Sequence, residues 1–551
     1  MFIEFNYDFK KNKAFLKSGF LDNIREHFSE KDEKAGLKKK ITGRKFFPDR
    51  KYAISVTGHF EIGLVVEIIK YLKTTDIPFQ IIFTDDFKSV FNSEYNFKSD
   101  KLVKLNMELR DYQELAIKKA ISNGKGIILS PTASGKTLIM ANLIETIRKN
   151  DNKTKSLIIT LPHLVEQTYN DFIEYGINEE ILSKWDGEND LNKDSKIIIT
   201  NSNILYSKTD NVQLDYKKNK IAILGTEKLL KIYEPTSDEY KKSLKDLEDL
   251  KKDQPKILKK LNERPIFEKF FNDINLLIVD EIHFFKKNSR NEDIFDFIKT
   301  KHRFSFTATL PNTLIDQWSI IGKTGPIIHE VPRQDLIDKK YISDVEVKVL
   351  LLLYKDIPDY FGIYEPENEN EEENTKLSTY KYEKELEFIQ SNNFRNIVIK
   401  KISEKLNKNT LIILDRLEHA SLVYEKLKKE MVDKQVFLIN GEVETVVREE
   451  IKKTMEKEDN VVCIAIAKIF STGVSINNLH NIILASTGKS KERLIQVFGR
   501  SARLHSSKKI ATIYDISSNL KYEYRHLLQR LELYKQEDFK YEIFKLKEAN
   551  L

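Results

Sequence analysis

The stretch that decides the fold is GIILSPTASGKTLIMANLIETI, residues 126–147. It begins with a short apolar run typical of a buried strand, passes through a loop of small residues, and ends in a helical pattern. The loop SPTASGKT (130–137) follows the phosphate-binding pattern GxxxxGKT, except that Ser130 replaces the first glycine. Its backbone N–H groups can cradle phosphates at a helix N-terminus, where the helix dipole favours anions. We therefore expect a nucleotide site formed by Thr132, Ser134, Gly135, Lys136 and Thr137.

Two carboxylates end the apolar run LLIVDEIHFF at 276–285. Asp280 can hold magnesium through water, with Thr137 as a second oxygen ligand, while Glu281 can orient or deprotonate an attacking water. Lys136 can reach the β and γ phosphates of a bound nucleotide. His283, two residues after the carboxylates, can link this site to the segment TAT, in which Thr307 and Thr309 are the coupling candidates.

Outward from these segments, short apolar runs alternate with helical stretches. Buried parallel strands read as continuous apolar runs, so the pattern predicts doubly wound α/β sheets. The first set of runs lies at 126–130, 156–161, 196–200, 275–280 and 304–309, and the second at 410–415, 435–440, 461–467, 481–486 and 510–516. Two tandem α/β lobes are therefore expected.

Before the lobes, AISVTGHF (53–60) and FQIIFTD (79–85) are predicted strands around a helix at 63–73, which indicates a small N-terminal α/β domain. The predicted domains are 1–104, 105–335 for the first lobe, 336–525 for the second, and a helical tail at 526–551. A charged insertion at about 206–270 predicts a solvated helical hairpin that Pro255 interrupts, with a nucleic-acid or partner contact as the other interpretation. An acidic loop is expected at 364–376.

Composition narrows the class of protein. The 551 residues carry 92 basic and 85 acidic side chains, and this net charge of +7 is compatible with nucleic acid without requiring it. The single cysteine, Cys463, excludes an internal disulfide and a cysteine-based metal cage. No apolar stretch approaches the length of a membrane span, and the start MFIEFNYDFKKNK lacks an apolar signal core, so a cytoplasmic location is expected.

A cluster of arginines marks the second lobe. QVFGRSAR (496–503) contains Gln496, Arg500 and Arg503 at the spacing QxxGRxxR, close to Arg493. A solvated basic helix face is the simpler interpretation, but this spacing favours an arginine finger that the second lobe supplies to a γ-phosphate held by the first. Such a contact can contribute roughly 10³–10⁵ in rate.

The ordered set of motifs resembles the superfamily 2 helicases. It comprises LRDYQ (109–113), SPTASGKT, DEIH (280–283), TAT, FSTGVSI (470–476) and QVFGRSAR. Further segments, among them NTLIILDRLEHA (409–420) and AKIFSTGVSINNLHNIILAS (467–486), resemble the UvsW-like phage helicases that act on branched DNA. The resemblance implies two RecA-like lobes, ATP and Mg²⁺ as cofactors, and branched or duplex-containing DNA as partner, in recombination, repair and replication.

The same resemblance implies roles for single residues. Gln113 would read adenine with Arg110 nearby, Gly473 would lie close to the nucleotide, and Thr307 and Thr309 would couple the ATP state to strand grip. The positions that match backbone-gripping motifs are Pro162, His163, Thr200, Asn201 and Thr472. For Asn201, a turn or helix-cap role is equally compatible with the sequence.

A basic segment lies in the N-terminal domain. LKKKITGRKFFPDRK (37–51) contains Lys38, Lys40, Arg44 and Lys45 around the pair Phe46-Phe47. Basic residues interleaved with aromatics suit phosphate binding and base stacking, which predicts a contact with duplex DNA beside a junction. A solvated lysine-rich loop is the alternative.

The sequence motifs are also compatible with other functions. An RNA helicase or a duplex-DNA translocase subunit would carry the same motifs, because phosphate contacts hold little sequence information. A P-loop kinase or transferase would explain Lys136 and Thr137, but it predicts one lobe and no QxxGRxxR. A binding protein with a decayed ATP site would not be expected to keep Lys136, Asp280, Glu281 and Arg503.

Overall fold

The computed structural model describes most of the chain. The described residues are 1–32, 49–92, 95, 102–209, 212–232, 234–287, 289, 291–292, 294–355, 357, 375–441, 443, 445–466, 476–485, 508, 510–536 and 539–548. They form two compact units, one of Met1–Ser130 with Lys136–Glu330 and one of Val331–Leu551 with Pro131–Gly135. None of the described helices has the length and apolar character that crossing a membrane requires.

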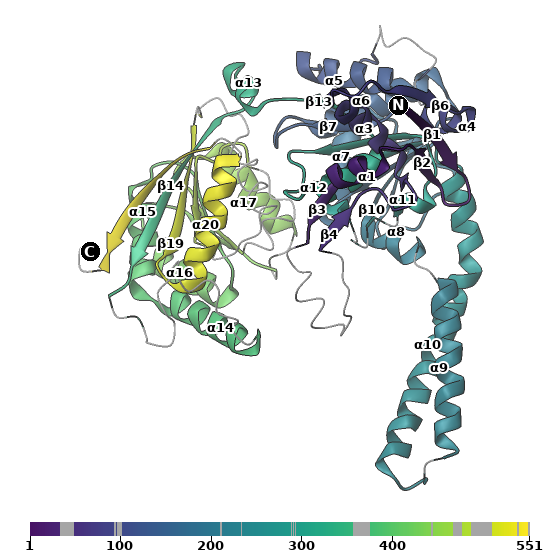
Figure 1. Ribbon diagram of the computed structural model, residues 1–551. Helices are drawn as coiled ribbons and strands as arrows, with labels where there is room; N and C mark the ends of the chain where they lie inside the picture. Colours follow the sequence, from purple (N-terminus) through teal and green to yellow (C-terminus); the bar gives the residue numbers. More distant parts are fainter. Residues whose placement is uncertain are drawn as a thin grey trace. The chain divides into compact units, whose positions relative to one another are not determined.

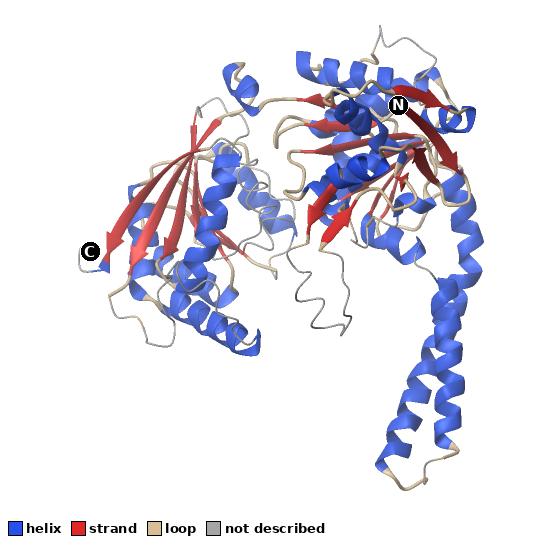
Figure 2. Ribbon diagram, in the orientation of Figure 1, coloured by secondary structure: helices blue, strands red, loops and turns tan. Residues whose placement is uncertain are grey.

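The first unit contains a seven-stranded, all-parallel sheet (Figures 1 and 2). Its strand order is β13-β7-β12-β11-β8-β10-β9. The strands are β7 (Gly126–Leu129), β8 (Ser156–Thr160), β9 (Leu182–Trp185), β10 (Ile197–Asn201), β11 (Leu276–Asp280), β12 (His302–Thr307) and β13 (Ile327–Glu330). The main helices are α5 (Asp111–Asn123), α6 (Lys136–Asn150), α7 (Val165–Glu174) and α12 (Leu314–Thr324). This is the RecA-like lobe that the apolar runs predict.

A second, four-stranded sheet precedes this lobe, in the order β5-β2-β1-β6. It consists of β1 (Phe2–Asp8), β2 (Lys13–Lys17), β5 (His59–Phe60) and β6 (Gln80–Phe83), with helices α1 (Leu21–His27), α3 (Val65–Lys73) and α4 (Asp85–Phe91). The strand predicted over 53–60 is wrong except at its end. Gly58 has φ +77° and its N–H donates to the carbonyl of Ser55, so this segment turns before β5 begins.

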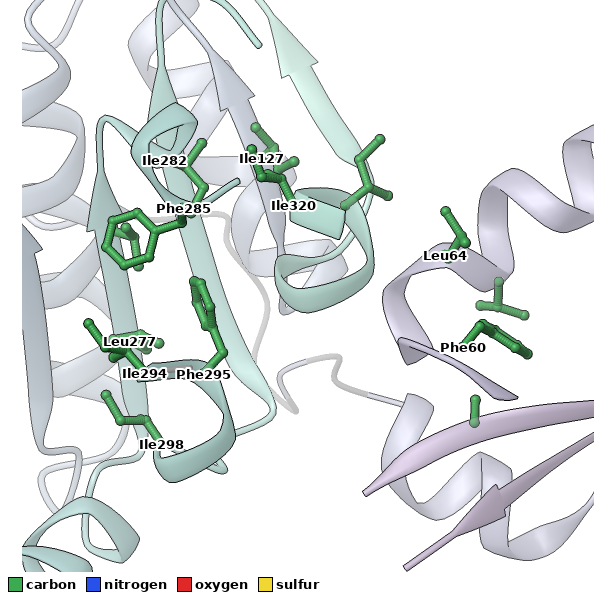
Figure 3. Packing of buried hydrophobic residues seen from close by; sticks show 14 of the residues in the cluster. Phe60, Leu64, Ile127, Leu277, Ile282, Phe285, Ile294, Phe295, Ile298 and Ile320 are labelled. Carbon is green, nitrogen blue, oxygen red and sulfur yellow. The ribbon is translucent and has the colours of Figure 1, made fainter. Parts of the chain in front are cut away.

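The N-terminal sheet and the lobe share one hydrophobic core. A single cluster of buried side chains includes Phe60 and Leu64 from the N-terminal segment with Ile127, Leu277 and Ile320 from the lobe (Figure 3). The predicted domain boundary near residue 104 therefore separates two sheets that share one hydrophobic core.

Close backbone contact reinforces this shared core. The short helix η1 (Ile62–Leu64) packs on α12 at Gly63, where a Cβ atom would lie 2.2 Å from the carbonyl oxygen of Ile321. Facing it, a Cβ on Gly322 would lie 2.5 Å from the Cβ of Glu61. Only glycines allow the two backbones to approach this closely.

The insertion forms the expected helical hairpin, of α9 (Val212–Leu230) and α10 (Asp238–Asn272) (Figure 1). The less exposed residues of α10 recur with alternating spacings of three and four, as in a coiled coil. Between residues 240 and 264 they are 240, 243, 247, 250, 254, 257, 261 and 264, with residue 263 also less exposed. Asn219 donates to the carbonyl of Leu250 at 3.1 Å, and Lys251 pairs with Glu227 at 3.0 Å, so polar contacts fix the register.

The predicted interruption of this helix at Pro255 is wrong, since α10 continues through Pro255 and also through Pro265. Pro255 is exposed, outside the stripe that packs on α9. The carbonyl of Lys251, which loses its usual helical donor to the proline, belongs to another exposed residue where water can replace that donor. Packing along the hairpin can then offset the cost of the proline.

The second unit contains another all-parallel seven-stranded sheet, in the order β16-β17-β15-β18-β19-β14-β20. The strands are β14 (Asp344–Leu353), β15 (Thr410–Leu414), β16 (Val436–Ile439), β17 (Val462–Ile466), β18 (Asn481–Leu484), β19 (Ile510–Ser518) and β20 (Lys540–Lys547). The helices include α14 (Thr375–Ser391), α15 (Asn393–Lys405), α16 (Leu417–Glu430), α17 (Thr445–Lys457) and α20 (Lys521–Gln536).

The helical tail predicted for 526–551 is wrong in its second half. Helix α20 ends at Gln536, and Lys540–Lys547 forms β20, which pairs with β14 at the edge of the sheet. Most of β20 is exposed, so its sequence lacks the apolar run of the inner strands. The acidic segment 364–376 lies almost entirely outside the described residues.

Candidate nucleotide site and nucleic-acid contacts

The phosphate loop connects β7 to α6. The N–H of Ser130 donates to the carbonyl of Thr307 at 2.9 Å, which places the start of the loop beside β12. Within the loop, the Ser134 hydroxyl donates to the carbonyl of Pro131 at 2.6 Å. Ala133 (φ +65°) and Gly135 (φ +76°) are left-handed. For Ala133 this conformation costs roughly 1–2 kcal/mol, a strain of the kind that functional loops retain.

Lys136 begins α6 and points toward the carboxylates. Its Nζ lies 3.4 Å from the carbonyl oxygen of Ser130 and 3.6 Å from Oε1 of Glu281. The Lys136 and Glu281 side chains are 11% and 14% exposed, so solvent screens this ion pair only partly. Thr137 follows in the first turn of the helix, as the phosphate-loop pattern requires.

Asp280 and Glu281 lie where β11 ends. Asp280 is buried, and its Oδ2 accepts a hydrogen bond from the hydroxyl of Thr160 at 3.3 Å. Burial raises the pKa of Asp280, and the charge of Glu281 raises it further. Burial would also raise the pKa of Glu281, but Lys136 and His283 outweigh that effect and hold it below its usual value.

His283 lies between Glu281 and the TAT segment. Its Nδ1 is 2.9 Å from Oγ1 of Thr307 and 3.3 Å from Oε2 of Glu281. The Thr307 hydroxyl donates to the carbonyl of Thr309 at 2.9 Å. A continuous set of contacts therefore runs from Lys136 through Glu281 and His283 to the TAT segment.

Three of the other site residues predicted for the first lobe are Gln113, Pro162 and His163. Gln113 is buried at the start of α5, and its Oε1 accepts the N–H of Arg110 at 2.9 Å, so its amide is fixed in orientation. Pro162 and His163 begin η2 (Pro162–Leu164), which is separated from β8 by Leu161 alone.

The Thr200 and Asn201 side chains have structural partners. Thr200 is fully buried and its hydroxyl donates to the carbonyl of Trp185 at 2.6 Å, so it presents no group to nucleic acid in this conformation. Asn201 is 3% exposed and accepts the N–H of Ile204 at 3.1 Å, which is the helix-cap role that the sequence left open.

Several predicted residues lie outside the described part of the chain. They are Gly473, Thr472, Gln496, Arg500 and Arg503 in the second lobe, with Lys38, Lys40, Arg44 and Lys45 in the basic segment. Their assigned roles remain predictions.

The sequence interpretation missed Thr160, which contacts the site, and Lys287, which follows DEIH and bonds to other segments of the first unit. Thr160 ends the apolar run of β8 and holds Asp280; a polar residue at the carboxyl end of a buried parallel strand was the available signal. Lys287 follows DEIH, and its Nζ donates to the carbonyl of Tyr52 at 2.8 Å while its N–H donates to Oδ1 of Asp316 at 3.1 Å. No local sequence pattern predicts these contacts of Lys287, because its partners lie far away in the sequence.

Two protein-family models match this chain, one in each lobe. The family described as type III restriction enzyme, res subunit, matches residues 106–312, and the helicase conserved C-terminal domain matches residues 393–505. With the two parallel-sheet lobes and the Lys136–Asp280–Glu281 site, these matches define the class: the chain is a superfamily 2 helicase and a nucleic-acid-dependent ATPase.

Within this class the chain is similar to the ATP-dependent DNA helicase UvsW of Enterobacteria phage T4. The two are 25% identical over 449 residues, which cover 78% of this chain and 76% of that protein. Putative helicase 22 of a Sulfolobus islandicus filamentous virus is 23% identical over 427 residues, covering 75% of this chain and 65% of that protein. Among solved structures, the DNA-bound ATP-dependent type ISP restriction-modification enzyme LlaBIII has a TM-score of 0.51 at 12% identity, over 94% of this chain and 36% of that one.

Proposed function

We propose that the protein is an ATP- and Mg²⁺-dependent motor that remodels branched DNA. The observation that carries the proposal is the set of contacts from Lys136 through Glu281 and His283 to Thr307, which can connect the state of a bound nucleotide to the segment after β12. The T4 relative is named an ATP-dependent DNA helicase, which supports DNA as the substrate.

The donor set suits magnesium. Thr137 and Asp280 offer a hydroxyl and a carboxylate, the hard oxygen ligands that Mg²⁺ prefers. Asp280 and Glu281 are adjacent carboxylates with little exposure, and Lys136 lies 3.6 Å from Glu281. Burial and the charge of Glu281 both raise the pKa of Asp280, and a divalent cation would offset that charge. Bound Mg²⁺ would neutralise charge on the β and γ phosphates.

Nucleotide binding would rearrange the Lys136–Glu281 pair. A γ-phosphate competes with Glu281 for the ammonium group, because Lys136 begins the helix on which the phosphates would lie. Glu281, once released, can accept a proton from the attacking water while His283 holds its second oxygen. Thr307 would sense this change through Nδ1 of His283.

The decisive experiment measures ATP hydrolysis and unwinding on a matched panel. ATPase activity should rise on adding DNA, and a three-way fork or four-way junction should be remodelled faster than a linear duplex with a single-stranded tail. RNA of the same sequence tests whether the nucleic-acid partner is DNA or RNA. Stimulation by RNA alone, or equal rates on linear and branched DNA, would contradict the proposal.

A second candidate is a duplex translocase that does not separate strands. The match of residues 106–312 to the res subunit of type III restriction enzymes favours it. Displacement of a triplex-forming oligonucleotide without release of either duplex strand would identify translocation, whereas strand release identifies a helicase.

We also propose that the basic segment around Lys38–Lys45 contacts duplex DNA beside the junction. Two short strands flank the segment, β3 (Ser29–Lys31) and β4 (Arg50–Tyr52), which pair antiparallel. Glu30 in β3 accepts the N–H of Ile315 at 3.1 Å, and the Tyr52 carbonyl in β4 accepts Lys287. This ribbon is thus bonded to the segments that follow both DEIH and TAT.

Salt dependence tests the basic segment. Replacing Lys38, Lys40, Arg44 and Lys45 by glutamine should flatten the slope of log K against log salt on duplex DNA by roughly 3–4, since each phosphate contact contributes about 0.9. Junction remodelling should fall more than ATPase activity stimulated by single strands. An unchanged slope and an unchanged junction preference would leave this segment a solvated loop.

A further inference from the structure

A hollow of about 840 Å³, open space at its mouth included, lies between the N-terminal sheet and the first lobe. Its walls include Tyr7, Phe9 and Asn12 from the N-terminal segment, and Lys125, Lys299 and Lys301 from the lobe. Lys125 directly precedes β7 and Lys301 directly precedes β12. The hollow therefore adjoins the amino ends of these strands, whereas the phosphate loop follows the carboxyl end of β7.

Part of the lining already has its charges paired. Lys323 pairs with Asp296 at 2.6 Å and with Glu61 at 3.1 Å. Arg303 donates hydrogen bonds to the carbonyls of Lys323, Ile298, Thr300 and Phe295 at 2.8, 2.7, 2.9 and 3.4 Å. The two acids that line the hollow thus already have a cation between them.

The other lysines of the lining have no acid paired with them within the described part of the chain. Lys299 and Lys301 are exposed and make no hydrogen bond or ion pair within the described part of the chain. Lys125 donates to the carbonyl of Phe91 at 2.7 Å, with its ammonium 4.6 Å from the centre of the Phe91 ring. Burial, with the charges of Arg303 and Lys301, lowers the pKa of Lys125 to about 8, so an anion here would relieve repulsion.

Two aromatic residues of the N-terminal segment, Tyr7 and Phe9, line the same hollow. Phe9 is 61% exposed, and its ring centre lies 5.0 Å from that of Tyr7 in an edge-to-face arrangement. The Tyr7 hydroxyl donates to Oδ1 of Asn12 at 2.7 Å, which leaves the amide nitrogen of Asn12 as a donor. Lysines and an exposed ring in one hollow are the combination with which proteins hold single-stranded nucleic acid, because the cations bind phosphate and the ring stacks on a base.

We propose that this hollow binds a nucleotide unit, with its phosphate on Lys125, Lys299 and Lys301 and its base on Phe9. The unit belongs either to a nucleic-acid strand that passes over the first unit or to a free nucleotide, and both present the same chemistry. The site is separate from the phosphate loop, and it does not depend on the proposed preference for branched DNA.

The test uses the full-length chain carrying Lys136→Ala, so that nucleotide binding at the phosphate loop is silenced. The probe is fluorescent dT12, followed by anisotropy over a series of salt concentrations. Lys299→Gln with Lys301→Gln should flatten the slope of log K against log salt by about 1.4, because each single-strand phosphate contributes about 0.7. Phe9→Ala should weaken binding about tenfold, the effect of losing one stacked base.

The control is Lys149→Gln with Lys153→Gln, which removes two exposed lysines of the same lobe and should change neither quantity. Deoxyadenosine monophosphate distinguishes the two sources of the ligand. A strand site keeps dT12 bound at millimolar competitor, whereas a free-nucleotide site binds the monophosphate directly and loses that binding in the lysine variant.

Crosslinking locates the contact. A dT12 carrying 5-bromodeoxyuridine should crosslink under ultraviolet light within the peptide containing Phe9, and Phe9→Ala should abolish this product. If neither dT12 nor the monophosphate responds to the lysine and Phe9 variants, the hollow binds no nucleotide unit, whatever the outcome of the junction panel.

Discussion

Glu281 lies between Lys136 and His283. Nucleotide phosphates would bind Lys136, and His283 contacts Thr307 of the TAT segment. Replacing Glu281 by glutamine removes the group that accepts the proton from water but leaves Asp280, Lys136 and Thr137 in place. We expect Glu281→Gln to bind ATP with near wild-type affinity while hydrolysis falls at least about 100-fold, the usual range for loss of a general base.

Equilibrium binding of a labelled ATP analogue, beside a steady-state ATPase assay, checks both parts of this prediction. Lys136→Ala is the contrasting variant, because it removes the phosphate cation and should lose affinity as well. Loss of ATP affinity in Glu281→Gln at saturating Mg²⁺ would contradict the role assigned to this carboxylate.

His419 offers a prediction about pH. It is 4% exposed, and its Nε2 donates to Oδ1 of Asn396 at 2.8 Å. Burial lowers the pKa of His419 to about 4, with the charge of Arg395 adding to the effect. The unfolded chain therefore binds the proton more tightly, so stability from neutral His419 is complete above about pH 6.5 and declines as the pH falls toward 4.

Between pH 7.5 and pH 5 the second unit should lose about 2 kcal/mol of unfolding free energy through His419 alone. His419→Gln cannot be protonated, so the difference between wild type and variant should shrink by that amount over the same interval. Urea unfolding at both pH values measures it. A difference that does not change with pH would exclude neutral His419 as a stabilising group.

Residues in local patterns were predictable, and residues with distant partners were not. The phosphate loop and DEIH could be located because strand, loop and helix are contiguous, and the structure brings Lys136 within 3.6 Å of Glu281 as that interpretation requires. Thr200 matched a motif position, but its hydroxyl is taken by Trp185, a contact that only the pairing of β9 with β10 creates. Sequence spacing carries no information about such a partner.

At the scale of elements, the docking of η1 on α12 depends on two facing glycines. A methyl group on Gly63 would meet backbone oxygen and nitrogen atoms of Ile321, Gly322 and Gly325, none of which can move aside like a flexible side chain. Gly63→Ala should therefore destabilise the first unit by roughly 1–3 kcal/mol, the usual cost of overpacking.

Gly19→Ala is the matched control, since nothing lies within 4 Å of the position its methyl group would take. Chemical unfolding of the two variants, with hydrogen exchange of η1 and α12, measures the difference. Equal stability of Gly63→Ala and Gly19→Ala would show that η1 can withdraw from α12 without cost.

Strands and helices could be located from the sequence where they are completely buried, and less well where they are only partly buried. The inner strands of both sheets are buried and mainly apolar, and they were located within a residue or two. Strand β20 is mostly exposed and β9 buries only its ends, so neither shows an apolar run. Pro255 misled the interpretation because a helix rule that holds on average was overridden by the packing of α10 along α9.

At the scale of the whole molecule, hydrolysis should require both lobes. The described part of the first unit contains the phosphate loop's lysine and both carboxylates, whereas the arginines of QVFGRSAR belong to the sequence of the second lobe. In proteins of this class, charge that develops on the γ-phosphate is stabilised by an arginine supplied from outside the phosphate loop. Arg503 is the residue that the motif spacing assigns to this task.

Arg503→Ala should therefore leave DNA binding largely intact and reduce DNA-stimulated ATP hydrolysis by about a thousandfold or more. Arg503→Lys keeps the charge but loses the planar fork that engages two phosphate oxygens, so it should recover only part of the rate. Thermal unfolding of both variants verifies that the second unit remains folded. Since an arginine finger acts on the transition state, the defect should appear in kcat while ATP affinity stays unchanged; a wild-type kcat in Arg503→Ala would remove this residue from the mechanism.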